Sequence, residues 1–194
     1  MKAKVISLLL VSCVIFSSCT SDVLQRDEYQ RNLRNIEGTS INITRRLFDT
    51  ESNDKCAIEL MIEIESSGNG SIVWNRPILD SNWPMTSCFS ENPEKLREEK
   101  FQVDKHVLLR IERSLARLRW ETEFDELAFS KLNFPLGCNE VMDASSSHNV
   151  SLEKAGKWMH FAIQPSCRSR QVPSDQLLVD DAIRLLPIEQ DLMP

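Results

Sequence analysis

The 194-residue sequence contains no apolar run of about 20 residues, the length that a helix needs to cross the hydrocarbon core of a bilayer. It has no C-x-x-C pair, no G-x-S-x-G serine motif and no glycine-rich loop of the phosphate-binding kind. Its three histidines do not pair at metal-ligand spacing. These absences favour a protein that binds over an enzyme, and we expect neither a metal nor a cofactor.

Disorder and nucleic-acid binding are also disfavoured by composition. Hydrophobic residues make up 41% of the chain and glycines number only five, as is typical of a folded globule. The formal net charge is −6, so a uniformly basic surface for nucleic acid is not expected.

The N-terminus has the pattern of a secretory signal. Lys2 and Lys4 provide positive charge, and residues 5–16 are apolar apart from two serines and a cysteine. A charged start, a short apolar core and an exit of small residues describe a segment that is removed on export. We therefore assign residues 1–18 to a signal peptide.

The exit of this segment is Ser17-Ser18-Cys19, which resembles the lipobox of bacterial lipoproteins, with Phe16 where leucine is usual. The resemblance covers only about the first 20 residues. It implies that Cys19 becomes the first mature residue and carries a covalent diacylglycerol and an acyl chain such as palmitate, which together anchor a protein firmly. In such lipoproteins Thr20, in place of aspartate, favours the outer membrane. Expected disulfide bonding favours the periplasm of a Gram-negative envelope, so we expect the periplasmic side of that membrane. The alternatives are an ordinary signal peptide with a secreted product, or exposure on the cell surface.

Cleavage before Cys19 leaves a mature chain of 176 residues with a net charge of −8, because the removed segment carries two lysines. This length suits one domain with a substantial core. We expect a lipidated tether over residues 19–38, which has room for a short helix that ends at Gly38, and a single globular periplasmic domain over residues 39–194.

Four further cysteines predict two disulfides in an exported protein. Three pairings are open to them, and we favour Cys56–Cys88 and Cys138–Cys167 because each pair flanks a local structural unit.

The clearest structural signal is a β-hairpin over residues 56–79. Ile58, Leu60, Ile62 and Ile64 point to one face and Glu59 and Glu63 to the other, and the turn-forming sequence Ser67-Gly68-Asn69-Gly70 follows. Alternation over residues 41–44 predicts another strand. Residues 124–134 and 157–163 fit either helix or strand, and aromatic content favours a strand for the second.

Two helices are expected to pack on this sheet. Asn92-Pro93 resembles a helix start, and the predicted long helix runs over about residues 93–120. Its core stripe comprises Phe101, Leu108, Ile111, Leu115 and Leu118. A last helix starts with Ser174 as its cap and ends before Pro187. The fold class is therefore α+β, with a small antiparallel sheet and helices on one face.

The long helix carries a basic strip. We use this name for His106, Arg110, Arg113 and Arg117, whose spacing of 4, 3 and 4 residues places them on one face opposite the core stripe. In an acidic protein this strip could bind an acidic partner or lipid headgroups. Alternatively, it is a solvated face paired with acids elsewhere, such as Glu59, Glu63 and Glu65 of the hairpin.

Catalytic motifs are weak. Ser151 and Lys154 match S-x-x-K, but the accompanying S-D-N and K-T-G elements are absent. The sequence therefore favours a lipid-anchored periplasmic protein-binding module, of which inhibitory and immunity-type lipoproteins are examples. The alternatives are an accessory subunit of an envelope assembly, which is a structural role, and a small hydrolase that uses Ser151 or His148.

Overall fold

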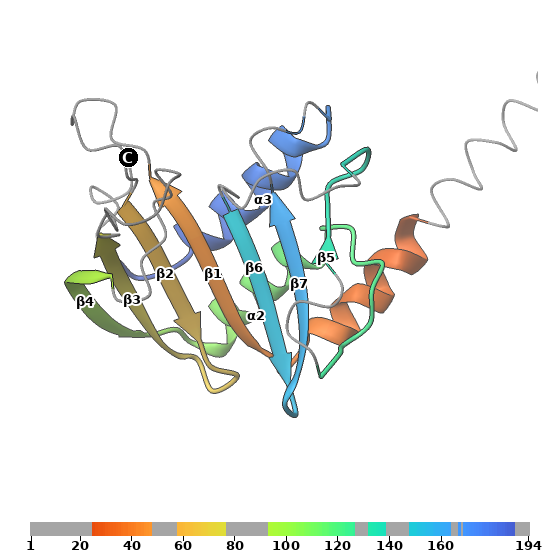
Figure 1. Cartoon of the computed structure of the whole chain (residues 1–194). Coiled ribbons are helices and arrows are strands. Elements are labelled where there is room, and N and C mark those ends of the chain that lie inside the picture. The colour runs from red at the N-terminus through yellow and green to blue at the C-terminus, as the bar shows by residue number, and fades with distance from the viewer. Residues whose placement is uncertain are drawn as a thin grey trace, which may run out of the picture.

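The chain folds into an α+β structure in which helices cover one face of a seven-stranded sheet (Figure 1). The computed structural model describes residues 25–47, 58–76, 93–126, 132–138, 148–163, 167 and 169–188.

The sheet is mixed and has the strand order β4-β3-β2-β1-β6-β7-β5. Its strands are β1 (Ser40–Leu47), β2 (Ile58–Ile64), β3 (Asn69–Arg76), β4 (Glu94–Gln102), β5 (Leu132–Asn133), β6 (His148–Lys154) and β7 (Lys157–Ile163). Neighbouring strands are antiparallel except β5, which pairs in parallel with β7. The α+β class is confirmed. The expectation of a small antiparallel sheet is wrong, because the sheet has seven strands and β5 adds a parallel pair at one end.

Three helices are described: one over residues 25–36, α2 (Lys105–Leu115) and α3 (Val172–Arg184). None of them is both long and apolar enough to span a membrane. In Figure 1, α2 and α3 lie behind the strands.

The predicted hairpin is confirmed as β2 and β3. Leu60, Ile62 and Ile64 are buried on the helix-covered face, whereas Glu63 is exposed on the opposite face. The turn closes through a hydrogen bond of 2.8 Å from the N–H of Glu65 to the carbonyl of Asn69. The strand predictions over residues 41–44 and 157–163 are confirmed as well.

The predicted long helix is wrong in its first third, because residues 94–102 form strand β4. Helix α2 begins only after Asp104, whose carboxylate accepts a hydrogen bond from the N–H of Val107 at 2.9 Å. A cross-strand fit explains the strand: Phe101 lies opposite Gly70, and a Cβ on that glycine would overlap the phenylalanine ring. This pairing outweighs the helix propensity of the charged residues in β4.

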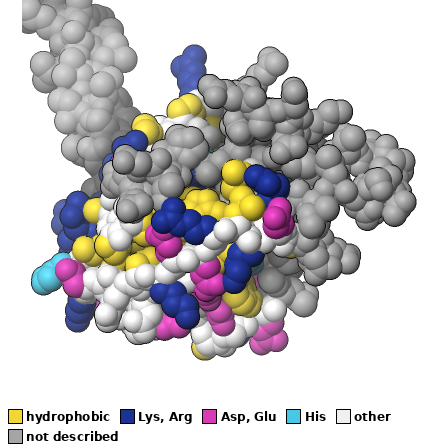
Figure 2. All heavy atoms as spheres, turned by 90° about the vertical axis from the view of Figure 1, so that its left-hand side faces the viewer, with side chains coloured by type: hydrophobic (Ala, Val, Ile, Leu, Met, Phe, Trp, Pro, Cys, Tyr) yellow, Lys and Arg dark blue, Asp and Glu magenta, His cyan; other side chains and the backbone are white. Residues whose placement is uncertain are grey.

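Strand β4 forms an edge of the sheet, and its charges suit that position. The guanidinium of Arg97 lies 5.2 Å from the ring centroid of Trp74 and covers it. Seen from this end of the molecule, hydrophobic side chains form a central band with charged side chains of both signs around it (Figure 2). Charged edge strands discourage pairing with other chains.

Part of the segment that we assigned to a tether belongs to the globular body. Residues 25–36 form a helix in which Ile36 is fully buried in the core. After this helix, the N–H of Gly38 donates to Oε1 of Glu112 at 3.1 Å, which joins the chain to α2. A globular unit that starts at residue 39 would leave out this helix.

The core lies between the sheet and the helices. Ile43, Val150 and Phe161 contribute from the sheet, and Ile111 and Val179 contribute from α2 and α3. Each fully buried aliphatic side chain of this size stabilises the fold by about 1.5–3 kcal/mol. The predicted stripe is confirmed at Leu108, Ile111, Leu115 and Leu118, whereas Phe101 is partly buried on β4. The last helix is confirmed, although it begins two residues before Ser174.

Candidate functional site

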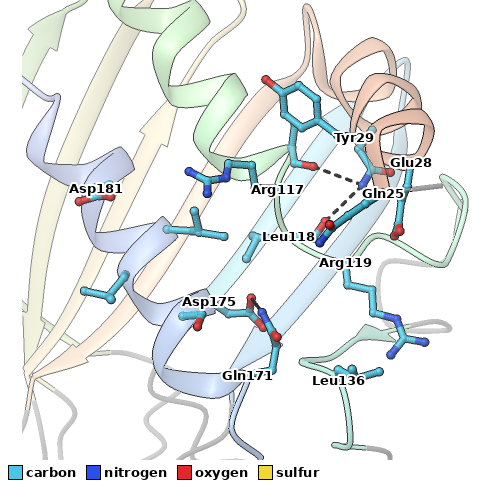
Figure 3. Close-up of a pocket in the computed structure, with 15 residues that line it drawn as sticks. Gln25, Glu28, Tyr29, Arg117, Leu118, Arg119, Leu136, Gln171, Asp175 and Asp181 are labelled. Carbon is cyan, nitrogen blue, oxygen red and sulfur yellow. Dashed lines mark hydrogen bonds between the residues drawn. The ribbon is translucent and has the colours of Figure 1, made fainter. Parts of the chain in front are cut away.

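A pocket of about 1020 Å³ lies between the helix over residues 25–36, the segment after α2 and the start of α3 (Figure 3). Tyr29 and Glu28 line it from the N-terminal helix, and Arg117 and Arg119 line it from the segment that follows α2. Its volume is at the upper end of the range for ligand pockets.

The chain after α2 directs the two arginines outward. Ala116, Leu118 and Trp120 are buried, so the residues between them face away from the core. The indole N–H of Trp120 donates to the carbonyl of Leu115 at 2.8 Å, which holds this segment against the helix end. Arg117 is consequently exposed at the pocket, and Arg119 forms an ion pair with Glu121.

Asn32 forms the wall on the N-terminal helix and is only 2% exposed. Its Nδ2 donates to the carbonyls of Ala116 and Leu118 at 3.3 and 3.2 Å, which fixes the helix to the segment after α2. Within the described part of the chain, its Oδ1 has no hydrogen-bond partner.

Asp175 forms the facing wall on α3 and is 1% exposed. Its Oδ1 accepts a hydrogen bond of 3.1 Å from Nε2 of Gln171, whereas its Oδ2 has no partner among the described residues. Burial raises the pKa of Asp175 above its ordinary value, and the hydrogen bond from Gln171 partly offsets this effect.

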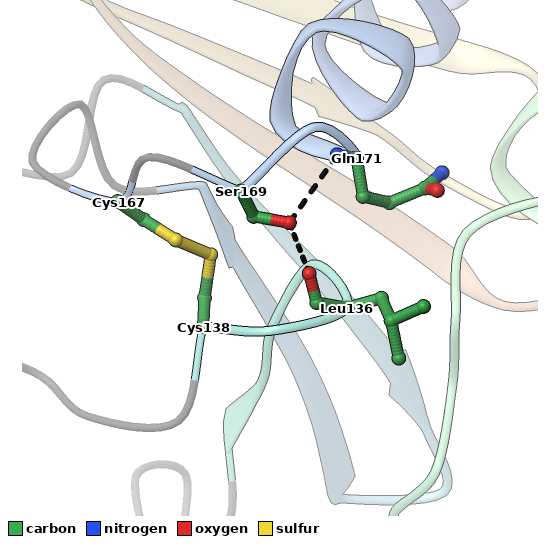
Figure 4. Close-up of a disulfide and its surroundings, with 5 residues drawn as sticks. All are labelled: Leu136, Cys138, Cys167, Ser169 and Gln171. Atoms are coloured by element: carbon green, nitrogen blue, oxygen red, sulfur yellow. Dashed lines mark hydrogen bonds between the residues drawn. A yellow bond between two sulfur atoms is a disulfide. The ribbon is translucent and has the colours of Figure 1, made fainter.

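Two leucines give the pocket an apolar part. Leu136 and Leu177 are each 56% exposed, and both line the pocket. Leu136 is held in place by its neighbours: Ser169 donates from its Oγ to the Leu136 carbonyl, and the Cys138–Cys167 disulfide lies beside this bond (Figure 4).

The Cys138–Cys167 disulfide confirms one predicted pairing, with the two Cα atoms 5.9 Å apart. Cys56 and Cys88 lie outside the described residues, so their pairing stays a prediction. Cys19 lies outside them as well.

The basic strip is exposed along its whole length, although Arg117 lies just beyond the end of α2. Within the described residues, Arg110, Arg113 and Arg117 form no ion pair. Pairing with the hairpin acids does not occur among these residues. Glu63 points from the opposite face of the sheet, so it cannot reach α2.

The candidate hydrolase residues do not come together. Ser151 and Lys154 are three residues apart in β6, so they point to opposite faces, and the same holds for Ser151 and His148. Lys154 instead donates to the Glu37 carbonyl at 3.2 Å.

Ser151 has a different partner, His160 of β7, with Oγ and Nδ1 at 2.7 Å. Burial lowers the pKa of His160, and its ring stacks on Trp158 with an interplanar angle of 2°. Sequence spacing did not suggest this pair, because it forms across two strands. No group of three or more His, Cys, Asp or Glu side chains in the described part of the chain could hold a metal ion.

Sequence analysis also missed most of the pocket. Of the residues that line it, only Arg117 was predicted to bind a partner, whereas Leu118 was expected in the core and Ser174 as a helix cap. One signal was available: Leu177 falls outside the apolar stripe of its helix, which comprises Val179, Ala182 and Ile183. An apolar residue outside such a stripe is expected to be exposed. No protein-family model matches the chain, and no curated protein is significantly similar to it.

Proposed function

We propose that the chain is a lipid-anchored, protein-binding module of the bacterial cell envelope, with the basic strip as its contact surface. The anchor is Cys19, and the partner is another envelope or periplasmic protein. An inhibitor or immunity-type lipoprotein is one form that such a module takes.

The absence of ion pairs at Arg110, Arg113 and Arg117, among the residues described, carries this proposal. The chain as a whole has a net charge of −6, so acids are plentiful, yet none of those described lies within ion-pair distance of these arginines. Uncompensated charge of one sign on a protein of the opposite sign attracts a complementary partner and raises the rate of association. An exported domain that carries a disulfide is consistent with the periplasm.

Affinity purification in mild detergent from the protein's own cells tests the proposal. The variant Arg110→Glu with Arg113→Glu should lose a stoichiometric partner while its unfolding temperature stays largely unchanged, because both side chains are exposed. The control is Lys95→Glu with Lys100→Glu, which makes the same charge change on β4. Retention of the partner by the strip variant would rule out the strip as the contact surface.

The Cys19→Ala form separates the module from its alternative. A binding module should keep its partner in this soluble form. An accessory subunit of an envelope assembly should instead co-purify with a large membrane complex that is lost once the anchor is removed.

A further inference from the structure

We infer that the pocket beside the basic strip binds an acidic peptide segment of the partner, with apolar side chains of that segment against Leu136 and Leu177. This inference rests on the proposed function and adds the chemistry of the bound segment.

The first observation is the charge of Arg117. This residue belongs to the basic strip and also lines the pocket, so a segment that leaves the pocket passes along the strip. Arg119 has Glu121 as its partner, whereas Arg117 has none among the described residues. A carboxylate of the bound segment supplies the missing partner in a charge-assisted hydrogen bond.

The second observation is the apolar part of the lining. Single exposed leucines are ordinary on protein surfaces. Here, however, two leucines with 56% exposure line the same pocket. Covering them with apolar side chains of the segment removes their surface from water, and this burial supplies affinity that charge alone does not.

The third observation selects a peptide over other anions. Besides Arg117 and Arg119, the lining includes the carboxyl groups of Glu28, Asp175 and Asp181, which repel a multiply charged phosphate group more strongly than a single peptide carboxylate placed beside Arg117. Oδ1 of Asn32 and Oδ2 of Asp175 are buried acceptors that have no donor within the described residues. A peptide carries N–H donors as well as carboxylates, so a small rotation of the Asp175 side chain would let it satisfy both kinds of lining group.

The probe for this inference is a displayed library of random peptides, selected on the mature chain with Cys19→Ala. Selected sequences should contain aspartate or glutamate close to a large apolar residue. A synthetic peptide with the best selected sequence should then bind at least tenfold more weakly to Arg117→Glu and to Leu177→Asp.

Matched variants distinguish the loss of a peptide contact from unfolding and from general charge effects. Arg117→Lys retains the charge and should retain most of the affinity. Leu96→Asp introduces the same acid at an exposed leucine of β4, away from the pocket, and should bind like the wild type. Leu177→Ala removes the apolar contact without adding charge, so it should also weaken binding if the leucine contacts the peptide.

Four results would overturn the inference. Selected peptides could lack acidic residues, or their affinity could be unchanged by both pocket variants. Vesicles of phosphatidylglycerol and phosphatidylethanolamine could bind in an Arg117- and Leu177-dependent manner while no peptide is selected, which would assign the pocket to a lipid headgroup. Should the strip variant lose the cellular partner while Leu177→Asp and Leu177→Ala keep it, the proposed function stands and this inference fails.

Discussion

Arg45 and Asp180 form an ion pair that joins the centre of the sheet to α3, with Nη1 and Oδ1 3.3 Å apart. Nε2 of His148 lies 3.5 Å from the same carboxylate oxygen, and His148 is the cross-strand neighbour of Arg45. Two adjacent strands thus contact one acid of the helix that forms a wall of the pocket. The position of α3 on the sheet therefore depends on charge as well as on apolar packing.

Replacing Asp180 should weaken this connection in a pH-dependent manner. Interaction with His148, and then the charge of Arg45, lower the pKa of Asp180 from its ordinary value of 3.8. A lowered folded-state pKa contributes stability above pH 3.8, and this contribution is lost as the pH falls through the folded pKa. We expect Asp180→Asn to reduce the free energy of unfolding by about 1–2 kcal/mol at neutral pH, with the difference shrinking in acid.

Urea denaturation at a series of pH values measures this effect. Asp181→Asn is the matched control, since Asp181 is the exposed neighbour of Asp180 and lies outside the contact with the sheet. An Asp180→Asn curve parallel to the wild-type curve at all pH values would contradict the expectation.

Gly68 in the β2–β3 turn should not tolerate a side chain. Its φ is +89°, its carbonyl accepts the N–H of Val103 at 2.9 Å, and a Cβ would overlap the carbonyl oxygen of Val103. Gly156 has a φ of +75° but open space around the Cβ position. Thermal denaturation should show that Gly156→Ala lowers the free energy of unfolding by about 1–2 kcal/mol from backbone strain alone. Gly68→Ala should lower it further, because its Cβ also overlaps Val103. Equal losses would indicate that the overlap is relieved.

Removing the Cys138–Cys167 disulfide should destabilise the fold. The two cysteines are 29 residues apart in the sequence. Closing a loop of this size lowers the conformational entropy of the unfolded chain, which raises the free energy of unfolding by about 3–4 kcal/mol. Denaturation of the double serine variant, compared with oxidised and reduced wild type, measures the loss. Because the bond lies beside Leu136, the double variant should also bind the selected peptide more weakly. Unchanged stability in both comparisons would assign the bond no structural role.

Lipidation should depend on Cys19 and not on the other cysteine of the leader. Metabolic labelling with palmitate should be lost in Cys19→Ala, and the protein should move to the soluble periplasmic fraction. Cys13→Ala is the matched control, because Cys13 lies in the apolar core of the proposed signal segment and the variant should be labelled like the wild type. Labelling of the Cys19→Ala form would contradict the assignment.

Strong local patterns predicted much of the fold, and cross-strand pairing decided the rest. Alternation in β2 and the apolar stripe of α3 are visible in the sequence because one face of each element is buried. In β4, consecutive charged residues carry no such alternation, and the strand forms because Phe101 fits over Gly70. The two residues of β5 are too few to carry any periodic signal.

The candidate site was harder to predict, because the pocket is formed by segments that are distant in sequence. Asn32 contacts Ala116 and Leu118 across more than 80 positions of the chain. The basic strip could be read from helical spacing alone. Whether its arginines meet acids depends on which face of the sheet α2 covers, and local sequence does not reveal this.

The start of the helix at residue 25 limits the distance between the domain and a bilayer in which Cys19 is anchored. If Cys19 is lipidated, only residues 20–24 separate the anchor from Gln25, which lines the pocket. A fully extended chain between Cys19 and Gln25 spans at most about 20 Å. The pocket is then confined to a thin layer next to the membrane, and a partner must enter that layer to be bound. Inserting residues into the segment 20–24 would let the pocket reach partners farther from the membrane. The binding surface itself would stay unaltered.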